Sequence, residues 1–315
     1  ELFLGYQAAT GTVYVLEHQI GDWFGQIAVP GFFMISGYQF YRDFDWGKLK
    51  GKWQRRVKSL LVPYIVWNFL YYLSYVIASR IPAVGDVVGK GVVEFSLAAM
   101  VDAVVAHTYN NVFWYLYQLL WLVVLAPVLY PLLKRRWSGL LLLAFFWILV
   151  RVNPNSFPVN PDALIYYGSG AMIALHCREA AEGAENGKRL AVGLLSLAAA
   201  AVIYYIGLWR AHTPSFVLCR LCAVVGLWLV LPGKHLPAAK DFMKHNFFLY
   251  AVHFAFVRLI NKGAAMLMAQ AVPEWYGPFG LFLVMPLLVL LISTMIGKVL
   301  RRYVPGLWNL LTGGR

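Results

Sequence analysis

A tyrosine and a histidine stand three residues apart in an apolar stretch near the end of the chain. They are Tyr250 and His253, within Asn246–Phe254. Residues at i and i+3 share one face of a helix, and ionisable side chains inside a membrane are costly enough to mark functional sites. Imidazole also has a pKa suited to taking a proton from a hydroxyl near neutral pH. We therefore predict that His253 faces a polar cavity and that Tyr250 and His253 are catalytic. The alternative for His253 is that its side chain reaches toward a helix end or pairs with backbone carbonyls.

Three cations precede the apolar run that begins near residue 59. They are Arg55, Arg56 and Lys58. Guanidinium groups form paired hydrogen bonds with phosphate oxygens, so this cluster is a candidate site for a phosphate-bearing donor. The alternative is that these charges only orient the chain and bind anionic lipids. The composition of the segment does not choose between the two.

Two arginines lie inside apolar stretches, Arg220 and Arg258. Few acidic residues lie in such stretches, so these arginines indicate an anionic ligand or a water-filled cavity. The competing interpretation is that each side chain reaches toward a helix end or pairs with backbone carbonyls.

Three further polar or aromatic positions are candidates for lining an acceptor cavity. Ser36 follows a Pro30-Gly31 break and precedes Gly37, in a pattern that permits close helix approach. Trp114 is also explained by an aromatic belt at the membrane surface. Gln118 lies one turn deeper and is predicted to face other helices. A kinked, packed helix without chemistry remains the alternative for Ser36.

The composition indicates a polytopic all-α membrane protein. The chain has 315 residues, of which 61% are hydrophobic and 13% charged, with a mean hydropathy of +0.64. Soluble domains are about 45–50% apolar and about 25% charged, so a soluble or disordered chain is excluded. Continuous apolar runs favour helices over a barrel. The three cysteines form no metal or disulfide framework, and we expect no metal and no bound cofactor.

The apolar runs predict a transmembrane helix bundle with about nine spans in a single domain, residues 1–315. The predicted spans are residues 23–41, 59–79, 111–133, 138–151, 162–176, 190–209, 215–231, 246–262 and 279–300. The amphipathic stretch 92–106 is a candidate interfacial helix lying on the membrane.

The basic residues set the orientation of these spans. Twenty of the 27 lysines and arginines fall on every second loop or on the C-terminal tail. Cytoplasmic loops carry such an excess, so the C-terminus is expected in the cytoplasm of a cell that holds this protein in its plasma or inner membrane. The net charge of +13 belongs to these loops, and we expect the lipid bilayer, not nucleic acid, as its partner.

The same orientation places residues 1–22 outside the cell as a lead-in. One expectation is therefore that a first span precedes Glu1, which makes ten in the parent protein. The alternative is a short translocated N-terminus that needs no earlier helix.

Four phrases, in this order, resemble the membrane-bound acyltransferase 3 family across essentially the whole chain. They are Val29-Pro30-Gly31-Phe32-Phe33-Met34-Ile35-Ser36-Gly37, the stretch from Arg55-Arg56 to Pro63-Tyr64, Trp114-Tyr115-Leu116, and Tyr250 to His253. The resemblance implies an integral membrane acyltransferase with about ten helices. Its acyl group, often acetyl, would come from an acyl-CoA cosubstrate and pass to a hydroxyl of a sugar, glycan or other envelope molecule.

The resemblance also implies an arginine and a histidine, the presumed general base, in a first helix. The only early histidine is His18, in a segment expected outside, and no arginine precedes Arg42. The family's first helix therefore looks absent from this chain.

Two other classes of function remain open from the sequence. One is a transporter or flippase of an anionic envelope precursor that uses Arg258 and His253. Transporters often contain inverted repeats, and no convincing repeat is found. The other is the membrane part of a larger enzyme or sensor.

Overall fold

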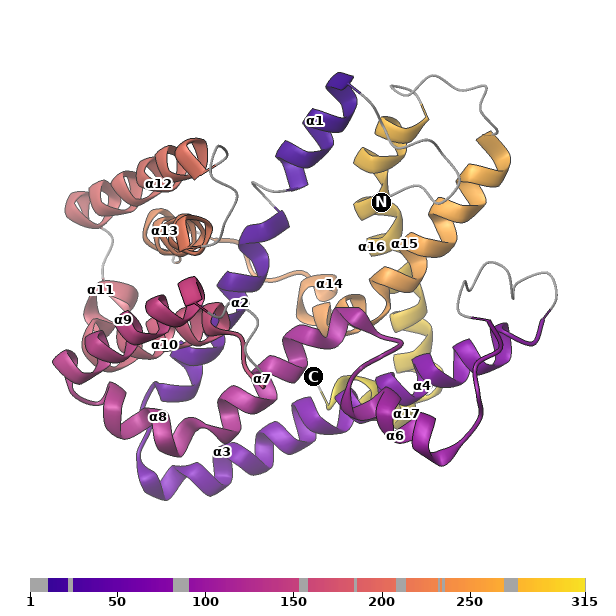
Figure 1. Cartoon of the computed structure of the whole chain (residues 1–315), viewed down its shortest axis with the longest axis horizontal. Helices are drawn as coiled ribbons and strands as arrows, with labels where there is room; N and C mark the ends of the chain where they lie inside the picture. Colours follow the sequence, from indigo (N-terminus) through magenta and orange to yellow (C-terminus); the bar gives the residue numbers. More distant parts are fainter. Residues whose placement is uncertain are drawn as a thin grey trace. The chain divides into compact units, whose positions relative to one another are not determined.

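The computed structural model is helical throughout its described part, and no strand occurs there. The described residues are 11–21, 25–81, 91–152, 158–183, 186–207, 214–231, 233, 236–268 and 277–314. In chain order the helices are α1 Gly11–Ile20, α2 Gln26–Tyr41, η2 Trp46–Lys48, α3 Leu49–Arg56, η3 Val57–Leu61, α4 Val62–Ala78, α6 Leu97–Val105, η4 Asn111–Phe113, α7 Trp114–Val124, α8 Ala126–Leu133, α9 Arg136–Val152, α10 Pro161–His176, α11 Arg178–Glu182, α12 Gly187–Gly207, α13 Pro214–Val230, α14 Asp241–Lys244, α15 Asn246–Met268, α16 Pro278–Tyr303 and α17 Pro305–Thr312 (Figure 1).

Every range predicted as a span is largely helical, but the count of nine crossings is not confirmed. Among the described residues, three helices are long and apolar enough to cross a membrane: Trp46–Ala78, Gly187–Gly207 and Pro278–Tyr303. A fourth is possible if Asn111–Val124 and Ala126–Leu133 form one span, although this pair is bent by 66°. The range 111–133, expected as one helix, is therefore broken near Leu125.

The helices divide into two compact units. Unit 1 comprises Glu1–Gln19, Gln54–Tyr117 and Ala239–Arg315, and unit 2 comprises Ile20–Trp53 and Gln118–Ala238.

Helices α2 and α10 of unit 2 touch backbone to backbone. A Cβ added at Gly37 would lie 2.1 Å from the carbonyl oxygen of Tyr167, and one at Gly170 would lie 2.0 Å from that of Met34. Small residues allow such close approach in membrane helices. The Ser36-Gly37 phrase therefore marks a helix–helix contact.

Helices α12 and α13 lie side by side as a hairpin in unit 2 (Figure 1). Gly193 and Gly226 face the partner helix closely, and the Ser196 hydroxyl donates to the Cys222 carbonyl at 2.9 Å. The buried Cys219 thiol lies 3.2 Å from the Ala200 carbonyl oxygen. Cys219 is thus part of the packing between these helices.

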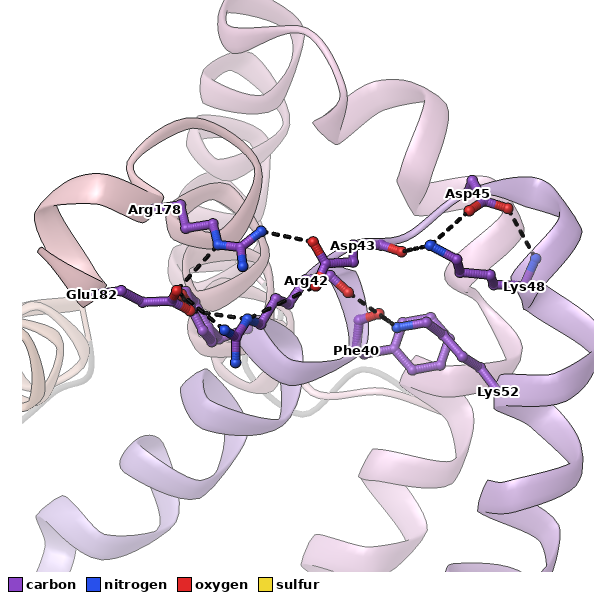
Figure 2. Close-up of polar contacts among 9 residues, drawn as sticks. Phe40, Arg42, Asp43, Asp45, Lys48, Lys52, Arg178 and Glu182 are labelled. Atoms are coloured by element: carbon purple, nitrogen blue, oxygen red, sulfur yellow. Dashed lines mark hydrogen bonds and ion pairs between the residues drawn. The ribbon is translucent and has the colours of Figure 1, made fainter.

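Ion pairs join two of the basic loops of unit 2 (Figure 2). Arg42, just after α2, pairs with Glu182 of α11 at 3.0 Å, and Arg178 pairs with Asp43 at 2.6 Å. The Tyr38 hydroxyl also donates to Glu182. The loops 42–58 and 177–189, predicted to share one side of the membrane, are therefore in direct contact.

Unit 1 is organised around α4. Helix α6 runs antiparallel to α4, because the Tyr72 hydroxyl donates to the Glu94 carbonyl at 2.9 Å and the Tyr64 hydroxyl donates to the Val105 carbonyl at 3.3 Å. Tyr71 of α4 also donates to the Ala251 carbonyl of α15 at 2.9 Å. The expectation that residues 92–106 lie on the membrane surface stays a prediction.

The C-terminal helix α17 returns to the start of α4. The buried indole of Trp67 donates to the Leu311 carbonyl at 2.9 Å, and Trp308 packs on Phe248 of α15 with ring centroids 5.2 Å apart. Helices α15 and α16 pack beside each other in the same unit. This arrangement holds the Tyr250–His253 end of α15 between α4 and α17.

Candidate active site

His253 has a defined ring orientation in the first half of α15. Its Nδ1 lies 2.7 Å from the backbone carbonyl oxygen of Tyr250, and the ring is half-buried. A carbonyl only accepts hydrogen bonds, so Nδ1 carries the proton in this arrangement. The neutral imidazole therefore presents Nε2 as its acceptor nitrogen, which is the atom needed to remove a proton from a hydroxyl.

Tyr250 links His253 to the segment before α7. Its hydroxyl donates to the Val112 carbonyl at 2.5 Å. Its ring stacks on Phe113 with centroids 5.4 Å apart and meets Tyr115 edge-on at 6.1 Å. Because Trp114 stands between these two aromatic residues in the chain, the Trp114 phrase and the Tyr250–His253 phrase come together in unit 1.

Arg258 interacts with a tyrosine of α4. Its guanidinium donates to the Tyr75 hydroxyl at 2.5 Å and lies 5.8 Å from the ring centroid of Phe254. The side chain thus has a neutral hydroxyl and an aromatic face as neighbours. Arg258 thus has structural partners within unit 1.

The three cations predicted to bind the donor lie just before and within a widened helical turn. Arg55 and Arg56 end α3, and Lys58 lies in η3, a π-helical turn at Val57–Leu61. Arg55 and Lys58 are exposed. π-turns inside helices are frequent at functional sites. The Gly313-Gly314 turn after α17 packs on this turn, since a Cβ at Gly313 would lie 2.7 Å from the Ser59 Cα.

Three of the cavity candidates belong to unit 2. The buried Gln118 side-chain oxygen accepts from the Asn160 backbone N–H at 2.8 Å, just before α10 begins. Arg220 interacts electrostatically with Asp162 and Tyr166 of α10. Ser36 is half-buried on α2. Gln118 and Arg220 thus have structural partners within this unit.

His18 lies on α1 in unit 1. Its Nδ1 lies 3.1 Å from the Tyr14 carbonyl oxygen, and its ring stacks on that of Tyr14 with centroids 3.9 Å apart. The side chain is exposed. Like His253, it presents Nε2 as the acceptor nitrogen when neutral.

The sequence analysis did not single out His107, seven residues before Trp114. This residue follows α6 and adopts a positive φ of 45°, and its ring lies 5.3 Å from that of Tyr117. Composition offers no signal for it, because a lone histidine between two helices is unremarkable by itself.

Comparison with protein families gives one match. A family model described as an acyltransferase domain, acyltransferase 3, matches residues 4–298. The match includes α1 with His18, the donor cluster and the Tyr250–His253 pair. No curated protein and no solved structure matches the chain.

Proposed function

The chain belongs to the acyltransferase 3 family, and on that premise we propose that it transfers an acetyl group from acetyl-CoA to a hydroxyl of a sugar, glycan or other envelope molecule. Its apolar helices agree with catalysis in a membrane. The observation that carries the proposal within the chain is the Nδ1 contact of His253, which leaves Nε2 available as a base.

The proposed transfer needs one histidine of this chain to move a proton from the acceptor to the departing CoA. Nε2 of the catalytic histidine takes the proton of the acceptor hydroxyl while the hydroxyl oxygen bonds to the thioester carbonyl carbon. The carbon–sulfur bond then breaks, and the CoA thiolate leaves and receives the proton from the imidazolium. The products are the acetyl ester and free CoA.

Two histidines compete for the role of base. His253 is half-buried in unit 1, and His18 is the only histidine in the early part of the chain, exposed on α1. We favour His253 because it lies beside Tyr250, which itself contacts Val112 and Tyr115 next to Trp114.

The test of the base uses membrane vesicles with acetyl-labelled acetyl-CoA and extracted envelope glycans. We expect His253→Ala to reduce labelled ester at least about 100-fold, the usual range for loss of a general base. Leu259→Ala, an exposed position on the same helix, is the matched control and should retain transfer. A fully active His253→Ala with an inactive His18→Ala would move the base to α1.

The donor would bind at Arg55, Arg56 and Lys58. We expect Arg55→Gln with Arg56→Gln to raise the KM for acetyl-CoA at least about tenfold, because hydrogen bonds to charged groups contribute about 1.5–3 kcal/mol each. The KM for the acceptor should change little. An unchanged donor KM in a correctly inserted variant would leave these residues as topology charges.

The same vesicles distinguish an acyltransferase from a transporter of an anionic precursor. A transporter would move a labelled precursor across the membrane without forming a new ester and without consuming acetyl-CoA. Ester formation that depends on acetyl-CoA supports the proposal, and its absence in the wild-type protein contradicts it.

A further inference from the structure

The segment between α6 and η4 holds a histidine in a conformation that L-residues rarely adopt. His107 has φ +45°, and Asp43 is the only other non-glycine residue with positive φ in the described part of the chain. Such backbone strain persists only where the surrounding structure imposes it, and it is concentrated at functional sites. Neither the family resemblance nor the proposed base explains it.

Buried polar atoms without partners lie in the same segment. Asn110 is 1% exposed, and neither its amide nitrogen nor its amide oxygen has a hydrogen-bond partner among the described residues. The same holds for Nδ1 of His107. Nearly all buried polar side chains in folded proteins are hydrogen-bonded. Here the Asn110 amide leaves one N–H donor group and one oxygen acceptor unpaired. Nδ1 of His107 is a second acceptor or a further donor, depending on which ring nitrogen carries the proton.

Aromatic rings connect this segment to the proposed active site within unit 1. The His107 ring lies 5.3 Å from that of Tyr117, and the Phe113 backbone N–H donates to the Asn110 carbonyl at 3.0 Å. Tyr64 lies 6.1 Å from Phe113, which stacks on Tyr250. The segment from His107 to Asn110 therefore leads directly into the aromatic residues that pack against Tyr250.

The side chains of His107 and Asn110 are uncharged. Burial lowers the pKa of His107 below its ordinary value, so the ring is uncharged near neutral pH. The nearby Asp102 carboxylate accepts a hydrogen bond from the Thr108 hydroxyl at 2.7 Å. An amide and a neutral imidazole offer mixed donors and acceptors beside apolar ring faces, which matches the alternating hydroxyls and C–H faces of a sugar ring better than it matches an anion.

We propose that His107 and Asn110 bind the acceptor, as a subsite for a neutral polyhydroxylated ring beside the Tyr250–His253 pair. Only the identification of this ligand as the acyl acceptor rests on the proposed function, because binding of a neutral polyol is a property of the segment itself. His107 is a binding residue in this scheme, and its strained backbone presents the imidazole to the ligand.

Ligand binding is tested on the purified full chain in a detergent without a sugar headgroup. Octyl β-glucoside and octyl phosphocholine serve as probes, because they share a tail and differ in the headgroup. We expect the glucoside to raise the thermal unfolding midpoint in a saturable way that the phosphocholine does not reproduce. Absence of a glucoside-specific shift in the wild-type protein would overturn the proposal.

Two variants separate binding from stability. His107→Asn should raise the unfolding midpoint without ligand, since asparagine adopts positive φ more readily, while weakening the glucoside effect at least about fivefold. Thr108→Ala, the control, should lower the midpoint by removing the bond to Asp102 and leave the glucoside effect intact. An undiminished glucoside effect in His107→Asn would show that the segment is structural only.

The acetyl transfer assay gives the independent readout. If the glucoside binds and His107→Asn abolishes its effect, the subsite stands even when the wild-type protein forms no ester, and only the proposed acyl transfer fails. If transfer occurs and His107→Asn leaves the acceptor KM unchanged, the proposed function stands and the subsite is wrong.

Discussion

The Tyr250 hydroxyl ties α15 to the segment before α7. Tyr250→Phe keeps the ring stack on Phe113 but removes the bond to the Val112 carbonyl. We expect a loss of about 1 kcal/mol in the free energy of unfolding, the usual contribution of one hydrogen bond. Acetyl transfer should fall in the same variant because the segment is less firmly held. Thermal unfolding and initial rates measure the two effects, and wild-type values for both would contradict this role.

Two carboxylates of unit 2, Asp43 and Glu182, make the stability of the fold depend on pH. Hydrogen bonds from Arg178 to Asp43 and from Tyr38 to Glu182, with the neighbouring arginines, lower the pKa of both carboxyls. A depressed folded-state pKa contributes stability that is present above the unfolded pKa of about 4 and is lost as pH falls through the folded value.

We therefore expect the unfolding midpoint to drop below about pH 4. Asp43→Asn combined with Glu182→Gln should flatten this drop, because the variant has no such carboxyls to protonate. Glu179→Gln, at an exposed position of α11, serves as the control and should keep the wild-type pH profile. A profile unchanged in the double variant would show that other groups control acid stability.

At the scale of elements, the α2–α10 contact depends on a missing side chain. Gly37→Ala would place a methyl group 2.1 Å from the Tyr167 carbonyl oxygen, so the helices must move apart. Overpacking costs about 1–3 kcal/mol. Gly31→Ala, on the same helix, meets nothing closer than 3.8 Å and should be tolerated. Thermal unfolding of the two variants tests the contact, and equal midpoints would refute it.

The C-terminal helix α17 belongs to unit 1, which also carries the predicted donor site at Arg55, Arg56 and Lys58. Gly313 has φ +71° and packs against Ser59, so Gly313→Ala adds both backbone strain of about 1–2 kcal/mol and a steric clash. We expect lower stability and a higher KM for acetyl-CoA, because the turn that carries Lys58 shifts. Gly306→Ala has no atom within 4 Å of the added Cβ and provides the matched control. Equal donor KM values in the two variants would separate α17 from the donor site.

At the scale of the whole molecule, the charge pattern predicts which loops lie outside the cell. Asn155 and Glu274 fall in segments 151–161 and 270–278, which we predict to be external, and both residues lie outside the described part of the structure. Asn155→Cys and Glu274→Cys, in a background without native cysteines, should react with an impermeant thiol reagent applied to intact cells. Protection of both positions would overturn the topology, including the cytoplasmic C-terminus.

The sequence alone predicted the all-helical fold, the position of several long helices and the family. Apolar runs must form helices in lipid, where backbone groups have no other partners, and charged clusters end them. The predicted range 162–176 therefore corresponds to α10 at Pro161–His176, and 279–300 to α16 at Pro278–Tyr303. The short motifs from Val29 to His253 likewise predicted the family that the match over residues 4–298 shows.

Tertiary structure decided which side chains meet, because an apolar pattern shows that a helix face is buried without showing what covers it. The break near Leu125 within 111–133 and the return of α17 to α4 are of this kind. So is the placement of Tyr250 against Val112, over a separation of 138 residues. The positive φ of His107, between α6 and η4, is a further feature that only the folded chain shows.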